Sequence, residues 1–497
     1  MSDRLKKIYL LPIATAGLFA SYFLVDLAVN KFSERNSAPS TQSVSKEDLL
    51  APYLENLRMP QDKPLSNIHL PLANLGQQLF FDVRFSKNEQ ISCATCHSPE
   101  KSFTDGKSKS AGIAQTDKNA PTLIFVAQQK WFFHNGRADS LAAQALGPIE
   151  NDKEHGFNRV RVAKIVDKYY RLNFEQIFGA LPPVEGIQDI YEGQGIPSQK
   201  EPIQVSEAVG AFALATLGDK TQLKSLLAKA QRERTQPAHL LMAQFGLAVQ
   251  GQTEFDRLSP PVQDSINQIF AWFGLAIAEF EKTIVTEASP FDQFATNFLQ
   301  SRQLSQSMGR QFGMRELSGF ELFATKAQCF QCHHGPLFSD QQFHNIGLPQ
   351  LENSTLDLGR SVGLILSKKN VFNCKSSYFQ HVPSKILIPI FEQITQSETC
   401  KESEFLDENE SDFVGAFKTP TLRNLPDTAP YFHDGRATDL LQVLDFYDQP
   451  EAFEPSVGHR APLIKNLNLS DSEKADLVAF LKSIRGQPRW GVDELNQ

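Results

Sequence analysis

Two copies of one cysteine and histidine motif give this sequence its clearest chemical signature. The first copy reads CATCH from Cys93 to His97, and the second reads CFQCH from Cys329 to His333. One helical turn between the cysteines places both sulfur atoms within reach of the two vinyl groups of one porphyrin, and the adjacent histidine then faces the iron. This spacing is the attachment signature of c-type haem. We therefore expect two covalently bound haem c groups, one held by Cys93, Cys96 and His97 and the other by Cys329, Cys332 and His333.

Cysteine pairs have two other common uses, and both are alternatives for these motifs. The two pairs together could form one structural zinc site, and a single pair could be a thiol–disulfide site. Neither use explains why a histidine directly follows the second cysteine in both copies. The remaining cysteines, Cys374 and Cys400, lie in a stretch, 361–414, that has no counterpart in the first half. In an oxidising compartment we expect them to form a disulfide that closes this loop, with two free thiols as the alternative.

A longer repeat contains further candidate residues. The stretch WFFHNGRADSLAAQALGPIE, residues 131–150, aligns without a gap with PYFHDGRATDLLQVLDFYDQ, residues 430–449. The alignment pairs His134 with His433, but it pairs Pro148 with Tyr447. A proline side chain has no atom that binds a metal, whereas a tyrosine can supply a phenolate oxygen. The two halves are therefore related modules that differ at a position with chemical consequences.

Apolar residues at helical spacing precede each motif and must position it. They are Leu72, Leu75, Leu79 and Phe80 before the first motif, and Leu317, Phe320, Leu322 and Phe323 before the second. Turn-rich stretches follow both motifs, and we expect further helices from Gln263 to Val285 and from Asp471 to Ile484, the latter after Ser470 as N-cap. These patterns predict a mainly α protein with two cytochrome c-like haem domains in tandem, an N-terminal one at 61–286 and a C-terminal one at 287–489. Insertions fall at 173–259 and 361–414.

The N-terminus and the composition indicate where such a protein works. Residues 8–29 form a mostly apolar run preceded by three basic residues, which predicts a transmembrane helix with its basic end in the cytoplasm. A cleaved signal peptide is the alternative. We expect residues 1–30 to form this segment, residues 31–60 to be a polar linker, and the body to be periplasmic and anchored to the inner membrane. The formal net charge of -8 argues against nucleic-acid binding.

From about Leu72 to Ile484, apart from the insertions, the sequence resembles the bacterial di-haem cytochrome c peroxidases, including the MauG-like branch. The resemblance implies two c-type haems, reduction of hydrogen peroxide at the N-terminal haem, and electrons that arrive through the C-terminal haem from a small cytochrome or copper protein. The stretches that carry it are LGQQLFFDVRFSKNEQISCATCH, NAPTLIFVAQQKWFFHNGRADSLAAQALGPIE, SPFDQF, CFQCHHGPLFSD, FHNIGL, GAFKTPTLRNLPDTAPYFHDGRA and DLVAFLKSI.

The resemblance also assigns roles to single residues. It implies that Pro148 lies over the open face of the first haem and that Gln144 and Glu154 are the polar residues beside it, with Glu154 as the acid–base group. It implies that Tyr447, where many relatives have methionine, binds the second iron as in the MauG-like branch. Packing of Tyr447 beside Phe446 is the alternative. The resemblance further implies a calcium ion between the domains, held by oxygen atoms of Asn119, Thr428 and Pro430.

Two departures from the wider family affect the expected chemistry. No histidine lies between His97 and His134, so we expect the first iron to be open to peroxide without prior reduction. His134 also replaces the tryptophan that usually relays electrons between the haems. Imidazole is much harder to oxidise than indole, so radical transfer through this position is in doubt unless Trp131 substitutes. We expect His134 and His433 to contact haem propionates, with His134 as an iron ligand as the alternative.

Three functions fit these residues. The first is a di-haem peroxidase that reduces hydrogen peroxide with electrons from a small redox protein. The second is a MauG-like oxidase that modifies a partner protein. The third is a non-enzymatic di-haem electron carrier with both irons capped, which Gln144, Pro148 and Glu154 argue against.

Overall fold

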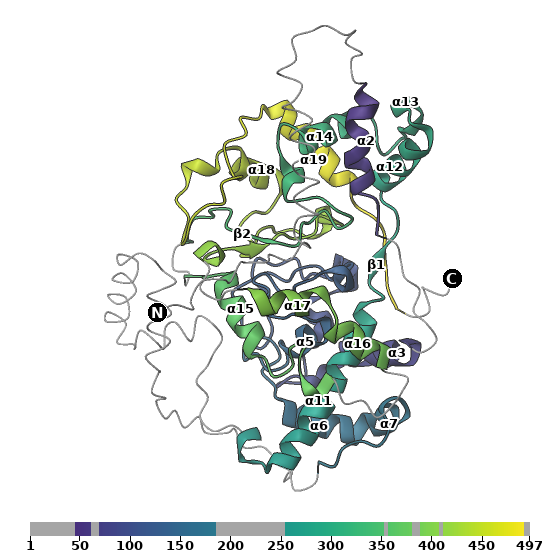
Figure 1. The fold of residues 1–497 in the computed structure, drawn as a ribbon, viewed down its shortest axis with the longest axis vertical. Coiled ribbons are helices and arrows are strands. Elements are labelled where there is room, and N and C mark those ends of the chain that lie inside the picture. The colour runs from purple at the N-terminus through teal and green to yellow at the C-terminus, as the bar shows by residue number, and fades with distance from the viewer. Residues whose placement is uncertain are drawn as a thin grey trace, which may run out of the picture. The chain divides into compact units, whose positions relative to one another are not determined.

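The computed structural model describes residues 45–60, 69–184, 254–351, 356–379, 388–406 and 411–491 (Figure 1). The chain divides into two units, residues 1–49 and residues 50–497, and each is considered by itself. The expected transmembrane segment, residues 31–44 of the linker and the middle of the 173–259 insertion lie outside the described residues. Within the described ranges, no helix is both long and apolar enough to cross a bilayer.

The described residues are mainly helical, as expected. The first half contains α3 (His69–Phe81), α4 (Cys93–Cys96), α5 (Leu141–Leu146), α6 (Arg159–Ile165), α7 (Arg171–Phe178) and α11 (Pro260–Glu281). The second half contains α12 (Pro290–Ser301), α13 (Leu304–Ser307), α14 (Met314–Ala324), α15 (Arg360–Lys369), α16 (Ile388–Thr395), α17 (Glu398–Phe405), α18 (Leu440–Asp448) and α19 (Asp471–Ser483). Helix α2 (Lys46–Asn56) precedes them, so the described part of the expected linker is not simply a tether.

Strands are short and join distant parts of the chain. Strand β1 (Val285–Thr286) pairs antiparallel with β4 (Pro488–Arg489), so the C-terminal residues return to the end of the first half. Strand β2 (Phe343–His344) pairs antiparallel with β3 (Phe417–Lys418). The helix expected from Gln263 to Val285 runs instead from Pro260 to Glu281. It begins three residues earlier than expected, and it ends before Val285 because Val285 belongs to a strand. Helix α19 begins at Asp471 as expected, and Ser470 and Glu473 form a reciprocal capping box.

The helix before each haem motif crosses the last long helix of its own half at a glycine. A Cβ added at Gly76 of α3 would lie 1.8 Å from the carbonyl oxygen of Ala276 in α11. A Cβ added at Gly319 of α14 would lie 2.0 Å from the carbonyl oxygen of Asp476 in α19. Backbones approach this closely only where a side chain is missing. Both modules thus support their motif with the same close helix pair.

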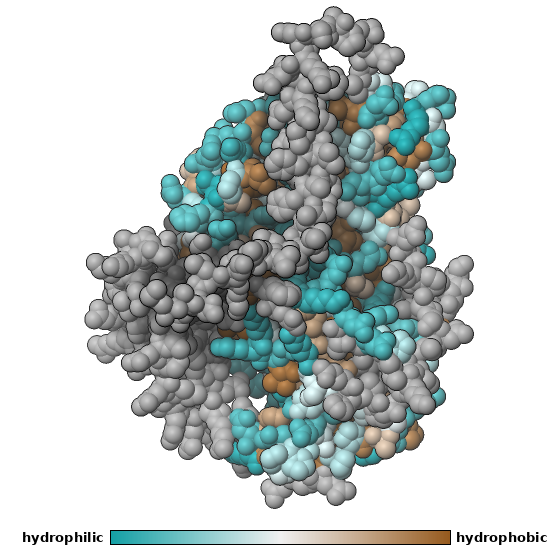
Figure 2. Space-filling model, in the orientation of Figure 1, coloured by the Kyte–Doolittle hydropathy of each residue, from teal (hydrophilic) through white to brown (hydrophobic). Residues whose placement is uncertain are grey.

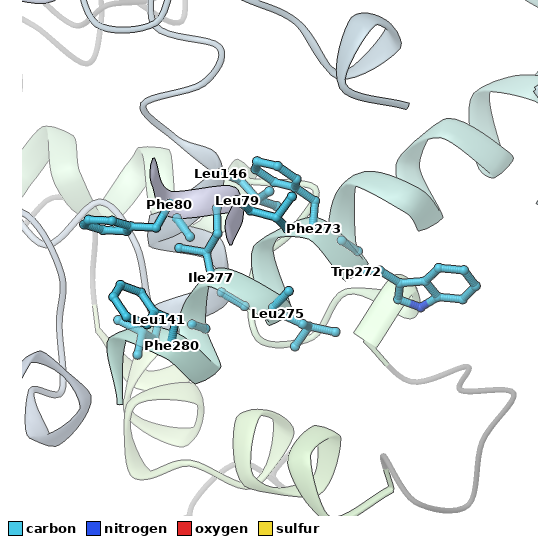
Figure 3. Close-up of a cluster of buried hydrophobic side chains, with 14 of the residues drawn as sticks. Leu79, Phe80, Leu141, Leu146, Trp272, Phe273, Leu275, Ile277 and Phe280 are labelled. Atoms are coloured by element: carbon cyan, nitrogen blue, oxygen red, sulfur yellow. The ribbon is translucent and has the colours of Figure 1, made fainter. Parts of the chain in front are cut away.

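Aromatic and aliphatic side chains form two main cores, one for each half. The first surrounds α11 and includes Leu79, Phe80, Leu146, Phe273 and Ile277 (Figure 3). The second surrounds α14 and α19 and includes Leu54 of α2. Outside the cores, the described residues on the face shown in Figure 2 are mainly hydrophilic.

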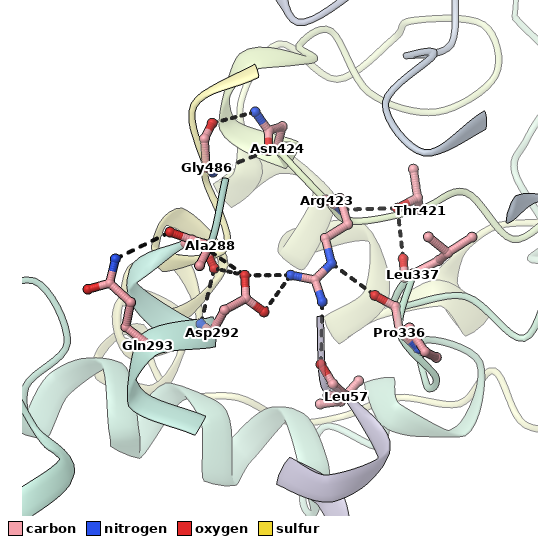
Figure 4. A network of polar contacts seen from close by, with 11 residues as sticks. Leu57, Ala288, Asp292, Gln293, Pro336, Leu337, Thr421, Arg423, Asn424 and Gly486 are labelled. Carbon is pink, nitrogen blue, oxygen red and sulfur yellow. Dashed lines mark hydrogen bonds and ion pairs between the residues drawn. The ribbon is translucent and has the colours of Figure 1, made fainter. Parts of the chain in front are cut away.

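A buried ion pair ties the second core to its loops. Arg423 and Asp292 are almost fully buried, and Nη1 of Arg423 lies 2.7 Å from both oxygens of the Asp292 carboxylate (Figure 4). The same guanidinium donates through Nε to the carbonyl oxygen of Pro336. Because Asp292 also accepts from the amide and hydroxyl of Ser289 at the start of α12, the charges are paired and hydrogen-bonded.

The 361–414 insertion packs on the opposite half of the chain from its sequence neighbours. Phe372, Phe379 and Ile390 belong to the core of the first half, and the ring of Phe372 lies 5.4 Å from that of Phe270 in α11. In the view of Figure 1, α15, α16 and α17 overlap the region of α5 and α11, and Asn267 of α11 donates to the hydroxyl of Tyr378 in this insertion. The insertion, which lies inside the expected C-terminal domain at 287–489, therefore contributes side chains to the core of the first half.

Candidate functional site

The first motif is built so that its histidine presents one free ring nitrogen. Cys93 to Cys96 form the single turn α4, and the amide of His97 donates to the carbonyl oxygen of Cys93 at 2.9 Å. Nδ1 of His97 lies 3.0 Å from the carbonyl oxygen of Phe103. A carbonyl oxygen only accepts, so Nδ1 carries the proton and Nε2 keeps its lone pair. Burial lowers the pKa of His97 and so favours this neutral form, which is the form that binds a metal.

The second motif repeats this arrangement. Cys329 to Gln331 form a short 3-10 turn, and the amide of His333 donates to the carbonyl oxygen of Cys329 at 2.8 Å. Nδ1 of His333 donates to the carbonyl oxygen of Phe338 at 2.8 Å, which again leaves Nε2 free. Each motif therefore offers two thiols and one oriented neutral imidazole, and these residues fit a covalently attached haem with an axial histidine.

Pro148 and Glu154 lie in the segment that follows α5. The carboxylate of Glu154 is near enough to the first motif to act on its cysteines electrostatically. The charge of Glu154 is among the groups that raise the pKa of the Cys93 and Cys96 thiols. Burial raises the pKa of Glu154 itself, and Arg137, whose Nη2 lies 3.9 Å from Glu154 Oε1, opposes that shift. Asn151 Nδ2 donates to Glu154 Oε1 at 2.8 Å, so the partly buried carboxyl group is held in one orientation.

Gln144 adds an unused acceptor to this segment. It lies in α5, which Ser140 caps through the amide of Ala143. The side chain of Gln144 is buried, and its Oε1 has no hydrogen-bond partner among the described residues. A buried amide oxygen without a donor is costly, so this atom is available to accept a hydrogen bond from a bound ligand.

Tyr447 lies within electrostatic reach of the second motif. It lies in α18, whose N-cap is Asp439, and its ring packs against those of Phe432 and Phe446. Burial is the main cause that raises the pKa of Tyr447 well above its ordinary value, and the thiols of Cys332 and Cys329 add to it. A tyrosine this close to the second motif can supply an oxygen ligand there, whereas Pro148, its repeat mate, has none to offer.

The two repeated histidines meet where the modules face each other. The rings of His134 and His433 are 6.5 Å apart, and the ring of His433 stacks on Phe417 at 3.7 Å. His134 Nε2 donates to the carbonyl oxygen of Asn119 at 3.1 Å. Burial lowers the pKa of His134 to about 4 and that of His433 to about 3, so both rings are neutral near pH 7.

Only part of the expected calcium site is assembled. Asn119 Nδ2 donates to the carbonyl oxygen of Pro430 at 2.8 Å, and Asn119 Oδ1 is buried without a partner. Thr428 instead donates its hydroxyl to the carbonyl oxygen of Leu425. Elsewhere in the described ranges, the one group of metal-binding side chains consists of Cys332, Asp340 and His344. A resident ion there would compete with haem attachment for the sulfur of Cys332.

The sequence analysis missed the residues that surround Trp131. Trp131 is buried, and the guanidinium carbon of Arg360 lies 3.8 Å from its ring centroid. Nearby, Lys118 pairs with Asp357, and Lys418 donates to Gln129. No spacing in the sequence indicates these contacts, because they join α15 and the flanking loops to the first half. The structure also joins Cys374 and Cys400 in a disulfide, with Cα atoms 5.7 Å apart.

Comparison with known proteins agrees with these observations. Residues 71–232 match the di-haem cytochrome c peroxidase family. The chain is 26% identical to the cytochrome-c peroxidase IdrP2 of Denitromonas iodatirespirans, covering 84% of this chain and 82% of that protein. It is 25% identical to the methylamine utilization protein MauG of Methylorubrum extorquens, covering 91% and 89% respectively.

A solved structure supports the fold. A variant of the diheme peroxidase BthA from Burkholderia thailandensis aligns with a TM-score of 0.50 and 16% identity, over 86% of this chain and 87% of that chain. The chain thus has the fold of this diheme peroxidase and relatives of both the peroxidase and the MauG kind. It is similar to the di-haem cytochrome c peroxidase family over residues 71–232 and to peroxidase and MauG relatives over most of its length, and it is an oxidoreductase with haem cofactors.

Proposed function

We propose that this protein reduces hydrogen peroxide at the haem of its first motif with electrons from a small redox protein. The observation that carries the proposal is the difference between the modules at one repeat position, Pro148 in the first and Tyr447 in the second. Pro148 offers no ligand atom, so the first iron would remain open to peroxide. Each haem, when bound, supplies an iron that accepts and releases electrons. Overall, one peroxide, two electrons and two protons give two molecules of water.

The polar residues of the first module supply the proton chemistry in this proposal. Cleavage of peroxide requires a proton to move from the inner to the outer oxygen. Glu154, oriented by Asn151 and raised in pKa by burial, would accept and return that proton. The free Oε1 of Gln144 would accept a hydrogen bond from the bound peroxide. His97 and His333 would bind the two irons through Nε2.

The MauG-like alternative is favoured by Tyr447. A phenolate is a hard anionic ligand that stabilises ferric iron, so a haem held by His333 and Tyr447 would have a low potential. Such a haem stores an electron poorly and favours sharing oxidising equivalents with the first haem. The physiological reaction would then be the oxidation of a protein substrate at a distance from the haems. It would take the place of peroxide reduction by a small donor.

The N-terminal run, the calcium site and the location complete the proposal. The exported family suits a periplasmic enzyme, and residues 8–29 would anchor it to the inner membrane. Asn119, Thr428 and Pro430 would hold calcium if the Asn119 amide and the Thr428 hydroxyl reoriented, since the free Asn119 Oδ1 is available to a cation.

Steady-state turnover with reduced cytochrome c and hydrogen peroxide tests the leading function. We expect saturable oxidation of the donor, two equivalents for each peroxide. If peroxide changes the optical spectrum but no small donor is oxidised, the result favours the MauG-like alternative. If peroxide leaves the spectrum unchanged, both enzymatic functions are wrong and the electron carrier remains.

A further inference from the structure

The guanidinium of Arg360 has one hydrogen-bonding edge that is buried and empty. Arg360 is the first residue of α15, and its side chain is 0% exposed. Its Nη1 donates to the carbonyl oxygen of Gly136 at 2.6 Å. Its Nε and Nη2 are also buried, and neither has a hydrogen-bond partner among the described residues. These two nitrogens form the parallel fork with which arginine grips a carboxylate.

The surroundings fix the guanidinium in place but do not neutralise it. Its carbon lies 3.8 Å from the ring centroid of Trp131 and 4.2 Å from that of Phe343, so aromatic rings cover it. Gly136 has a φ of +67°, and a Cβ there would lie 2.4 Å from Arg360 Nη1 and from the Phe343 ring. The turn around Gly136 is thus shaped to receive this side chain.

Among the described residues, no carboxylate fills the empty edge. Asp139 and Glu402 are near enough to act on Arg360 electrostatically, but no hydrogen bond joins either of them to it. Asp139 accepts from the amide of Cys374 instead. Burial lowers the pKa of Arg360 to about 9, so it remains largely protonated near pH 7. A buried cation with two unused donors is costly, and a carboxylate is the group that would offset the cost.

We propose that Arg360 binds a propionate carboxylate of the haem attached to the first motif. This haem is assigned because Arg360 contacts Gly136 and Trp131, both of which belong to the first module. Arg360 itself starts the segment that carries the disulfide, so the second half of the chain would hold a cofactor of the first. The proposal rests on the family's haem and not on the proposed function, since an electron carrier would need the same anchor.

The test compares three variants of the full haem-loaded protein. In Arg360→Gln the positive charge is lost, so ferric haem is favoured and the first haem becomes harder to reduce. We expect about a tenfold fall in its ratio of ferrous to ferric haem at fixed potential, which is about 59 mV for a one-electron couple. In Arg360→Lys the charge remains but the fork is lost, so the potential should change less while the propionate bending band in the resonance Raman spectrum shifts.

Glu402→Gln distinguishes the two sources of a carboxylate. If a haem propionate fills the edge, this variant leaves the potential and the propionate band of the first haem unchanged. If Glu402 is the partner, this variant leaves the Arg360 charge uncompensated and raises the potential of the first haem, and the proposal is wrong. The proposal is also wrong if the potentials and propionate bands of both Arg360 variants equal those of the parent. If Arg360→Gln does not retain haem, the propionate band of Arg360→Lys is the test. A shifted band supports the proposal, and an unchanged band contradicts it. Peroxide turnover, measured separately, reports on the proposed function alone.

Discussion

At the scale of single residues, the hydroxyl group of Tyr447 is the most consequential difference between the modules. Tyr447 lies on α18, within electrostatic reach of the thiols of Cys332 and Cys329, whereas its repeat mate Pro148 follows α5 and has no donor atom. We predict that Tyr447→Phe removes an oxygen ligand from the second iron. Its ferric optical and electron paramagnetic resonance spectra should therefore change, and the potential of that haem should rise because an anionic ligand is lost.

Tyr431→Phe is the matched control for this prediction. Tyr431 lies in the same repeated segment, but its hydroxyl donates to the carbonyl oxygen of Leu425. Its removal should leave both haem spectra as in the parent. Spectra of Tyr447→Phe that match the parent would exclude ligation and would remove the main support for the MauG-like alternative.

Glu154 gives a second prediction at this scale, with a defined dependence on pH. The group must be ionised to accept the peroxide proton, and burial raises its pKa above the ordinary value. The rate of reaction with peroxide should therefore rise with pH through this raised pKa and be lost as pH falls below it. Glu154→Gln should reduce the rate by about 10² to 10⁴ and abolish this limb of the pH profile. Stopped-flow mixing with peroxide measures both effects.

Asp152→Asn is the control for Glu154. Asp152 is exposed on the same turn, so the variant changes one nearby carboxylate and leaves Glu154, which is partly buried, unchanged. An unchanged pH profile in Glu154→Gln would assign the proton transfer to another group.

At the scale of elements, the segment from α15 to α17 is held to the first half at several points. The amide of Cys374 donates to Asp139, Thr399 donates to the carbonyl oxygen of Lys130, and the Tyr378 hydroxyl contacts Asn267 of α11. The Cys374–Cys400 disulfide closes this segment over a sequence separation of 26 residues. The disulfide thus cross-links an insertion that hydrogen bonds hold to the first half.

We predict that the double variant Cys374→Ser and Cys400→Ser lowers stability without loss of haem. Removal of the cross-link restores chain entropy to the unfolded state, which amounts to about 2–4 kcal/mol. Thermal unfolding followed by circular dichroism should show a lower midpoint for the variant. Parent protein treated with a thiol reductant should behave in the same way, because thioether bonds to haem are not reduced. Equal midpoints for variant and parent would show that packing alone holds the segment.

At the scale of the whole described body, residues of the two modules meet at Asn119 and Pro430. The Asn119 amide already bridges them, and its Oδ1 is unused. We predict that calcium added to chelator-treated protein changes the haem spectra and restores activity, because the ion would fix the modules at their shared face. Asn119→Ala should abolish that response. A titration that changes neither spectrum nor activity would mean that Asn119 serves only as a hydrogen-bonded bridge.

The helices show which features of the fold local sequence patterns can predict. The capping box at Ser470 and the apolar spacing before each motif predicted α19, α3 and α14 well, since these signals depend on neighbours a few residues away. The end of α11 was predicted four residues too late. Val285 continues the apolar pattern, but it pairs with Arg489, more than two hundred residues further along the chain. A tertiary contact therefore overrode the local preference.

The sequence by itself determined the attachment motifs, the repeat and the contrast between Pro148 and Tyr447, because these are patterns of residue type and spacing. Only the tertiary structure decided which nitrogen of His97 and His333 is free, since carbonyl groups five and six residues away orient the rings. It alone also put Arg360 of α15 against Gly136 and Trp131. Such contacts depend on how a segment from one half packs on the other, and packing at long range leaves no periodic trace in the sequence.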